Sequence, residues 1–152
     1  MTRSAQFLLF LLRVAMGWFM FYAGITKVMD PTWTAAGYLH GAKTFTAFYE
    51  WLALPAHIGV VNVMNEWGLT LLGVSLIFGI AVRWSSFFGA ALMLLYYFPI
   101  LVFPHPNPHA FIVDEHIIYA LLLLFFSAER VGYCIGLERL AERIPGLRII
   151  AG

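Results

Sequence analysis

The chain has 152 residues, of which 62% are hydrophobic and only 11% are charged, whereas soluble domains average about 45–50% apolar and about 25% charged residues. This composition argues against a water-soluble monomer and predicts a single membrane domain, residues 1–152. A net charge of +1 provides no basic surface for nucleic acid. Because Cys134 is the only cysteine, an intramolecular disulfide, disulfide-exchange chemistry and a thiolate-rich metal site are excluded.

Four apolar stretches are candidates for membrane-spanning helices, since a bilayer core about 30 Å thick takes roughly 20 helical residues. They are residues 5–28, 64–82, 85–103 and 112–128. The first is too long for a secretory signal peptide and contains Arg13, so we expect it in the mature protein. The short connections predict an all-α integral membrane protein with a four-transmembrane-helix bundle.

The distribution of lysine and arginine predicts the orientation of the helices. One side of the membrane would hold Arg3, Arg83, Arg130, Arg139, Arg143 and Arg148, and the other Lys27 and Lys43. We therefore expect a multi-pass protein of the cell (inner) membrane with both termini in the cytoplasm. The spacing of apolar and charged residues in the tail, 129–152, predicts an amphipathic helix on the inner surface of the bilayer.

The outer loop, 30–63, is rich in aromatic residues, which favour the headgroup region of a bilayer. We expect one or two short interfacial helices in it, the clearest at about 43–54. These helices either anchor the loop in lipid or cover a substrate.

Each predicted span carries one stripe of small and polar residues at helical spacing. These stripes are Arg13, Gly17, Met20, Gly24 and Lys27; Glu66, Thr70, Gly73 and Ile77; Ser85, Gly89, Leu92, Tyr96 and Pro99; and His116, Ala120, Leu123 and Ser127. Small residues let membrane helices approach closely, and polar residues seek partners away from lipid. The four stripes should therefore converge on the axis of the bundle.

Ionisable residues inside a membrane mark functional sites, because a charge at mid-bilayer costs about 2.5–3.5 kcal/mol even on lenient scales. Lys27, Glu66 and His116 should line a polar vestibule at the outer end, together with Asp114 and Glu115. Tyr96 and Tyr119 should lie just beneath it. Alternatively, Lys27 pairs with Glu66 or Asp114 and only holds the helix ends together.

Arg13 is predicted deep and near the inner side, about 21 Å from Lys27 along the helix. It is more readily explained as a structural residue than as part of the vestibule. It either extends to the inner interface or donates to backbone carbonyls.

Asp114 is well placed to cap the helix that follows it. Three prolines between Phe103 and His109 prevent His105 and His109 from sharing a helical face, so no metal site is predicted there. A zinc or copper site formed by His105, His109, His116 and an acidic residue remains an alternative. The sequence contains no motif for haem or flavin.

Several segments together resemble the DoxX/DoxD family. They are LRVAMGWF at 12–19, YAGITK at 22–27, EWGL at 66–69 with LG at 72–73, GIAVR at 79–83 and DEHIIYA at 114–120. The segments occur in order over almost the whole chain and include the ionisable residues of the predicted spans.

The resemblance implies a four-helix membrane protein similar to the DoxD-type subunit of thiosulfate:quinone oxidoreductase, which works with a separate partner subunit and a membrane quinone. It would place Glu66 and His116 at the catalytic centre, with His116 as proton acceptor. It would also place Lys27, Tyr96, Asp114 and Tyr119 around the substrate or quinone headgroup.

Three functions stay open from the sequence. The first is a membrane subunit of a quinone-linked oxidoreductase. The second, of nearly equal weight, is a non-catalytic accessory subunit of a larger respiratory or metalloenzyme complex. The third is a permeation unit for a small solute, supported only by the polar stripes.

Overall fold

The structure, a computed structural model, describes residues 2–129 and 131–133. This part of the chain is helical and has no strand beyond two isolated bridges in the loop 101–114. Its elements are α1 (Arg3–Val28), α2 (Ala36–His40), α3 (Thr46–Ala53), α4 (Ile58–Phe78), α5 (Val82–Ile100), α6 (Glu115–Ala128) and the 3₁₀ helix η1 (Val131–Tyr133). The all-α prediction is therefore confirmed for the described residues, while the predicted tail helix lies almost entirely outside them.

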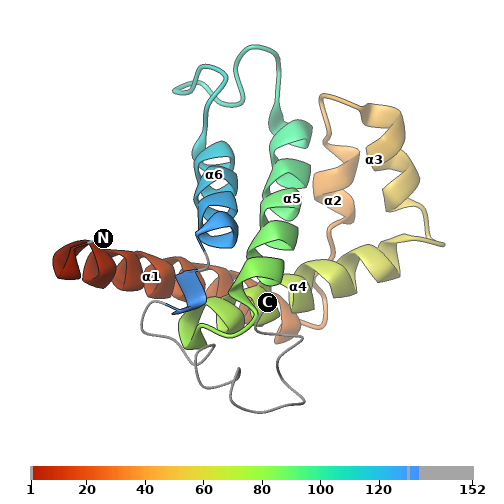
Figure 1. The fold of residues 1–152 in the computed structure, drawn as a ribbon. Coiled ribbons are helices and arrows are strands. Elements are labelled where there is room, and N and C mark those ends of the chain that lie inside the picture. Colours follow the sequence, from red (N-terminus) through yellow and green to blue (C-terminus); the bar gives the residue numbers. More distant parts are fainter. Residues whose placement is uncertain (1, 130, 134–152) are drawn as a thin grey trace.

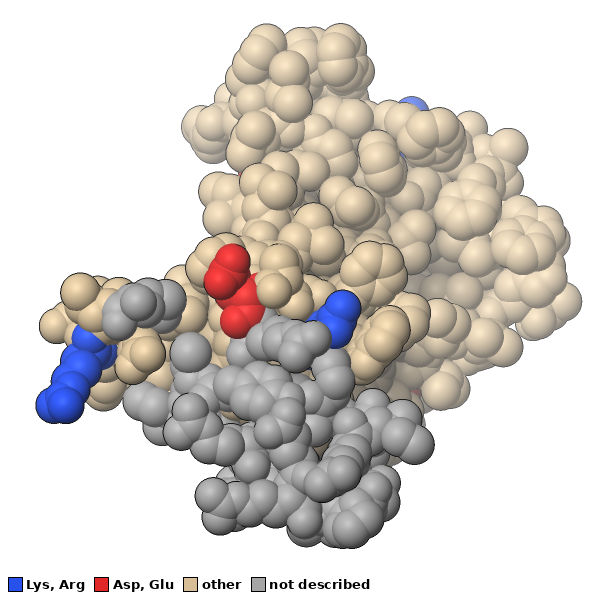
Figure 2. Space-filling view, viewed as in Figure 1, with Lys and Arg blue, Asp and Glu red and all other residues tan. Residues whose placement is uncertain are grey.

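The long helices pack in a row, with α1 against α4, α4 against α5, and α5 against α6. Figure 1 shows α1 lying across the α5–α6 pair rather than alongside it, with α2 and α3 beside α5. Among the described helices, α1 and α4 are long and apolar enough to cross a membrane, and α6 is apolar but has 14 residues. The face in Figure 2 carries few charged side chains, in keeping with a lipid environment.

The helix boundaries differ from the predicted spans where local turn chemistry decides them. α4 begins at Ile58, six residues before the predicted start. It ends at Gly79, which adopts φ 68° and donates its backbone N–H to the Ser75 carbonyl at 2.8 Å. Glycine tolerates this left-handed conformation without a Cβ clash, so the helix stops there.

The outer loop contains the short helices that its aromatic residues predicted, and α3 falls within the predicted range. The segment that carries them is fastened to the second half of α5 and the residue that follows it. Tyr49 donates to the Leu95 carbonyl at 3.1 Å, and Thr44 to the Leu101 carbonyl at 2.6 Å. The segment around α2 and α3 is therefore a lid docked on α5, rather than a free loop.

Glycine allows α1 and α4 to approach with their backbones in contact. A Cβ atom on Gly24 would lie 2.4 Å from the Thr70 nitrogen, and one on Gly73 would lie 2.3 Å from the Phe21 nitrogen. Both distances are far below ordinary van der Waals contact. The predicted stripes of small residues on these two helices are therefore the surfaces along which they pack.

Arg13 is fully buried, at 0% exposure. Its Nη1 donates to the Val131 carbonyl at 3.1 Å and to the Gly132 carbonyl at 3.5 Å, just after α6. Its guanidinium also lies over the Phe10 ring, 5.5 Å from the centroid. Of the two predicted alternatives, donation to backbone carbonyls is confirmed, and extension to the interface is wrong.

Candidate functional site

Three helices meet at a single buried amide oxygen. Asn65, on α4, is buried, and its Oδ1 accepts a hydrogen bond from Lys27 Nζ at 3.0 Å and another from Tyr96 OH at 2.7 Å. Lys27 comes from the last turn of α1, and Tyr96 from α5. This arrangement leaves further N–H groups of the Lys27 ammonium available to a ligand, because an ammonium has three donors.

Lys27 is also surrounded by aromatic rings. Its Nζ lies 5.0 Å from the centroid of Trp33 and 5.7 Å from that of Tyr96, within the range of cation–π attraction. The predicted pairing of Lys27 with Glu66 or Asp114 does not form, since the ion pairs of the described part of the chain are His40–Glu50 and Asp114–His116. Glu66 is half-buried and acts on the ammonium only through space.

Asp114 and His116 form a second polar pair beside this cluster. Asp114 Oδ1 accepts from the backbone N–H groups of His116 at 3.0 Å and Ile117 at 3.3 Å, so its predicted role as N-cap of α6 is confirmed. Its Oδ2 lies 2.8 Å from His116 Nδ1. Because the carboxylate occupies Nδ1, Nε2 is the ring nitrogen left to meet a ligand.

Two cavities flank these side chains, and both are lined by Lys27, Tyr96 and His116. The first, of about 310 Å³, lies under the lid and is completed by Trp33, Thr34, Ala35, Tyr38 and Asn65. The second, of about 340 Å³, is completed by Phe19, Met20, Ala23, Leu69, Met93, Glu115 and Tyr119. Of the predicted site residues, Lys27, Tyr96, His116 and Tyr119 thus line a cavity, Asp114 holds His116, and Glu66 lines neither.

The lid is hydrogen-bonded over the first cavity. Tyr38 OH donates to the Tyr96 carbonyl, and Asn62 Oδ1 accepts from the Ala35 backbone N–H at 2.9 Å. Burial raises the pKa of the Tyr38 phenol, so it remains a neutral donor at physiological pH. The lid therefore borders the cavity and is held in place by hydrogen bonds that do not depend on charge.

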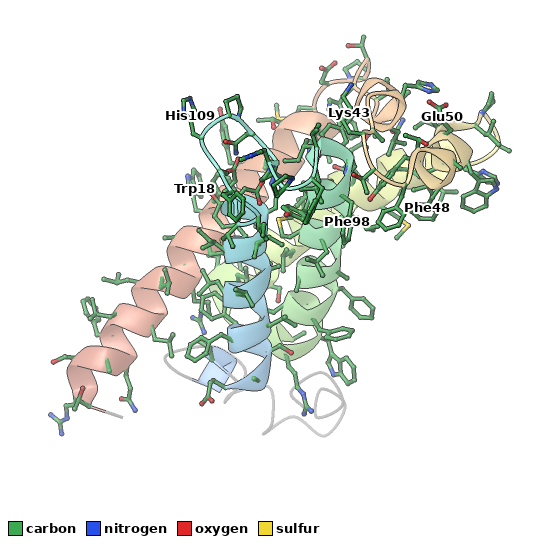
Figure 3. The ribbon with its side chains drawn as sticks, turned by 90° about the horizontal axis from the view of Figure 1, so that it is seen from above. Trp18, Lys43, Phe48, Glu50, Phe98 and His109 are labelled. Atoms are coloured by element: carbon green, nitrogen blue, oxygen red, sulfur yellow. The ribbon has the colours of Figure 1, made fainter. Side chains whose placement is uncertain are left out.

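The alternative metal site from His105, His109 and His116 does not assemble among the described residues. The cluster of ligand-type side chains found there consists of Asp114, Glu115 and His116, with ligand atoms within 4.8 Å of one another. Asp114 Oδ1 already accepts the hydrogen bonds of the N-cap, and Oδ2 already faces His116 Nδ1. His109 lies out on the loop between α5 and α6 (Figure 3).

Asn65, Trp33 and Tyr38 belong to the site but were not predicted from the sequence. Asn62 and Asn65 are three residues apart, a spacing that places both on one helical face once the helix begins at Ile58. The predicted span began at residue 64, so it included Asn65 but left Asn62 outside the helix. A polar residue recurring at helical spacing in an apolar stretch was the signal that could have identified Asn65.

Comparison with known proteins finds no matching curated protein and no matching solved structure. The sequence profile of the DoxX family matches residues 8–102, well over half of the chain. The match includes Lys27, Asn65 and Tyr96, whereas Asp114 and His116 lie beyond it. The chain belongs to the DoxX family.

Proposed function

We propose that this DoxX family protein is the membrane subunit of a quinone-linked oxidoreductase, with α1, α4, α5 and α6 crossing the inner membrane and both termini in the cytoplasm. The exposed surface of α1 supports this placement, since Leu8, Trp18 and Tyr22 are each at least 60% exposed. Such large apolar side chains lose nothing in lipid but are unfavourable in water. By family resemblance the reducing substrate is thiosulfate, oxidised at a separate partner subunit.

The observation that supports the proposal most strongly is the wall shared by the two cavities. A quinone headgroup is a flat ring with two carbonyl oxygens, and it needs hydrogen-bond donors next to apolar space. Lys27 Nζ, and His116 Nε2 when the ring is protonated, are the groups at this wall that can donate to such oxygens, because the Tyr96 hydroxyl already gives its one proton to Asn65. The adjoining Trp33 and Tyr38 rings fit the flat face of the headgroup.

Two residues have separate roles in the proposed chemistry: Lys27 stabilises negative charge, and His116 transfers a proton. A bound quinone would accept two electrons and two protons. Lys27 stabilises negative charge on the nearer oxygen, and the aromatic rings beside it exclude water and strengthen that interaction. His116, oriented by Asp114, holds or releases a proton at Nε2. Glu66 acts on Lys27 through space and is not assigned a contact with the ligand.

The proposal is tested by titrating the protein in nanodiscs with 2,3-dimethoxy-5-methylbenzoquinone, a headgroup without a tail, and following quenching of Trp33 fluorescence. Trp33→Phe identifies the signal from this residue. We expect Lys27→Met and His116→Gln each to weaken binding by about tenfold or more, because a hydrogen bond from a charged or fixed donor contributes about 1.5–3 kcal/mol.

Matched controls are Lys43→Met and His109→Gln, which change exposed residues of the same types outside both cavities (Figure 3). They should bind like the unchanged protein. Equal binding by Lys27→Met and Lys43→Met would show that the ammonium at the wall does not contact the headgroup. Stable co-purification with larger subunits whose turnover is unaffected by Lys27→Met would instead support a non-catalytic accessory subunit.

A further inference from the structure

The four long helices do not form a closed ring. α1 packs closely on α4, α4 on α5 and α5 on α6, but within the described part of the chain α1 barely touches α6. In Figure 3, α1 runs obliquely past α6 and the two helices diverge along their lengths. The row of helices therefore has one open seam, between α1 and α6.

The seam is closed at one end and hollow at the other. At its inner end, the hydrogen bonds from Arg13 to the Val131 and Gly132 carbonyls tie α1 to the segment that follows α6. Toward the outer end lies the 340 Å³ cavity. Hence the two helices are joined by hydrogen bonds below the cavity, and beside it, in the described part of the chain, they meet through the ring contact between Phe19 and Tyr119 rather than through close helix packing.

The walls of this cavity are apolar except where Lys27, Tyr96, Glu115 and His116 line it. Met20, Leu69 and Met93 form a buried floor. Phe19, which is 50% exposed, and Tyr119 contact each other across the seam, with their ring centroids 5.3 Å apart. The polar side includes the shared wall with Lys27 and His116. The cavity therefore changes from polar to apolar along the direction that leads outward between the helices.

We propose that the ligand of the polar site is an amphiphile that moves in sideways from the bilayer through the seam between α1 and α6, and that its apolar tail stays in the seam while its headgroup contacts the shared wall. This inference rests on the proposed function and adds the route and the tail. The lid is hydrogen-bonded to α4 and α5 beside the other cavity through Asn62 and Tyr38, whereas α1 and α6 have no close packing along the seam in the described part of the chain. An apolar tail dissolved in the bilayer would therefore lie next to the seam between α1 and α6.

Ala23 provides a test because it lines the cavity from α1 with a small, half-buried side chain. Ala23→Phe should fill the seam while leaving the headgroup contacts intact. Two probes with one headgroup are compared in nanodiscs: 2,3-dimethoxy-5-methylbenzoquinone and its decyl derivative. We expect Ala23→Phe to weaken binding of the decyl probe by about tenfold and of the tail-free probe by less than about twofold.

The matched control is Ala91→Phe, the same substitution at an exposed position on α5, in the apolar groove between α4 and α5. It should change neither affinity. Unchanged decyl binding by Ala23→Phe, or equal loss of both probes, would overturn the seam as the tail site while leaving the proposed function in place. Failure of the unchanged protein to bind either probe would overturn both.

Discussion

The close crossing of α1 and α4 makes a sharp prediction about two glycines of α4. An added Cβ at Gly73 would lie 2.3 Å from the Phe21 nitrogen and 2.5 Å from its Cα, whereas one at Gly68 meets nothing within 4 Å. The two sites share a helix and differ only in what faces them. Gly68→Ala is therefore a matched control for Gly73→Ala.

The expected magnitude follows from these contacts. To reach ordinary contact distance, the two backbones must separate by about 1 Å at Gly73, and overpacking of this kind costs about 1–3 kcal/mol. The obstacle is backbone rather than a flexible side chain, so we expect the upper end of that range. Replacing a helical glycine by alanine by itself raises the free energy of unfolding by about 0.5–1 kcal/mol at either site. The net loss for Gly73→Ala is about 2 kcal/mol.

The assay is thermal unfolding of both variants in the same detergent. For a chain of this length, about 2 kcal/mol corresponds to a Tm lower by about 4–8 °C, while Gly68→Ala should match or slightly exceed the unchanged protein. The reasoning is refuted if the two variants unfold at the same temperature. It is also refuted if Gly68→Ala is the less stable of the two.

Two further predictions concern the lid and the cap of α6. Asp114→Ala removes the N-cap acceptor and should lower the free energy of unfolding by about 1 kcal/mol, while Asp114→Asn keeps an acceptor and most of that stability; denaturation midpoints distinguish the two. Because burial raises the pKa of Tyr38 above its ordinary value of 10.0, the folded protein retains this proton longer than the unfolded chain does, and stability should fall as pH rises above that value. Thermal scans across this range should show a shallower fall for Tyr38→Phe, and parallel curves would contradict the assignment.

Features that depend on local geometry could be predicted from the sequence. Arg13, Gly17, Met20 and Gly24 share a face because of the 100° helical repeat, and all four are buried. Capping by Asp114 was predictable for the same reason, since an N-cap involves only the next three residues. The shared face and the cap both follow from positions a few residues apart along the chain, so no knowledge of the tertiary fold was needed to predict them.

Choices of partner between helices could not be predicted in this way. From the sequence, the carboxylates of Glu66 and Asp114 were the expected acceptors for Lys27, yet its ammonium donates to Asn65. Which acceptor lies nearest depends on where α4 begins and on the angle at which it crosses α1. The lid is a similar case, because its contact with Tyr96 joins residues from the outer loop and α5. Aromatic composition indicates an interfacial segment but not the helix on which it docks.

The crossing and the polar site are one feature of the structure rather than two. Gly24 lies against Thr70, and α1 and α4 run in opposite directions, so the turn after Gly24 faces the turn before Thr70. Lys27 is three residues beyond the first and Asn65 five residues before the second, offsets of about 4.5 and 7.5 Å along the two helices. A wider crossing would carry Lys27 Nζ away from the Asn65 oxygen, which would then keep only the hydrogen bond from Tyr96 OH. Substitutions at Gly24 or Gly73 should therefore reduce ligand binding at the wall shared by the two cavities as well as the stability of the protein, although neither glycine lines either cavity.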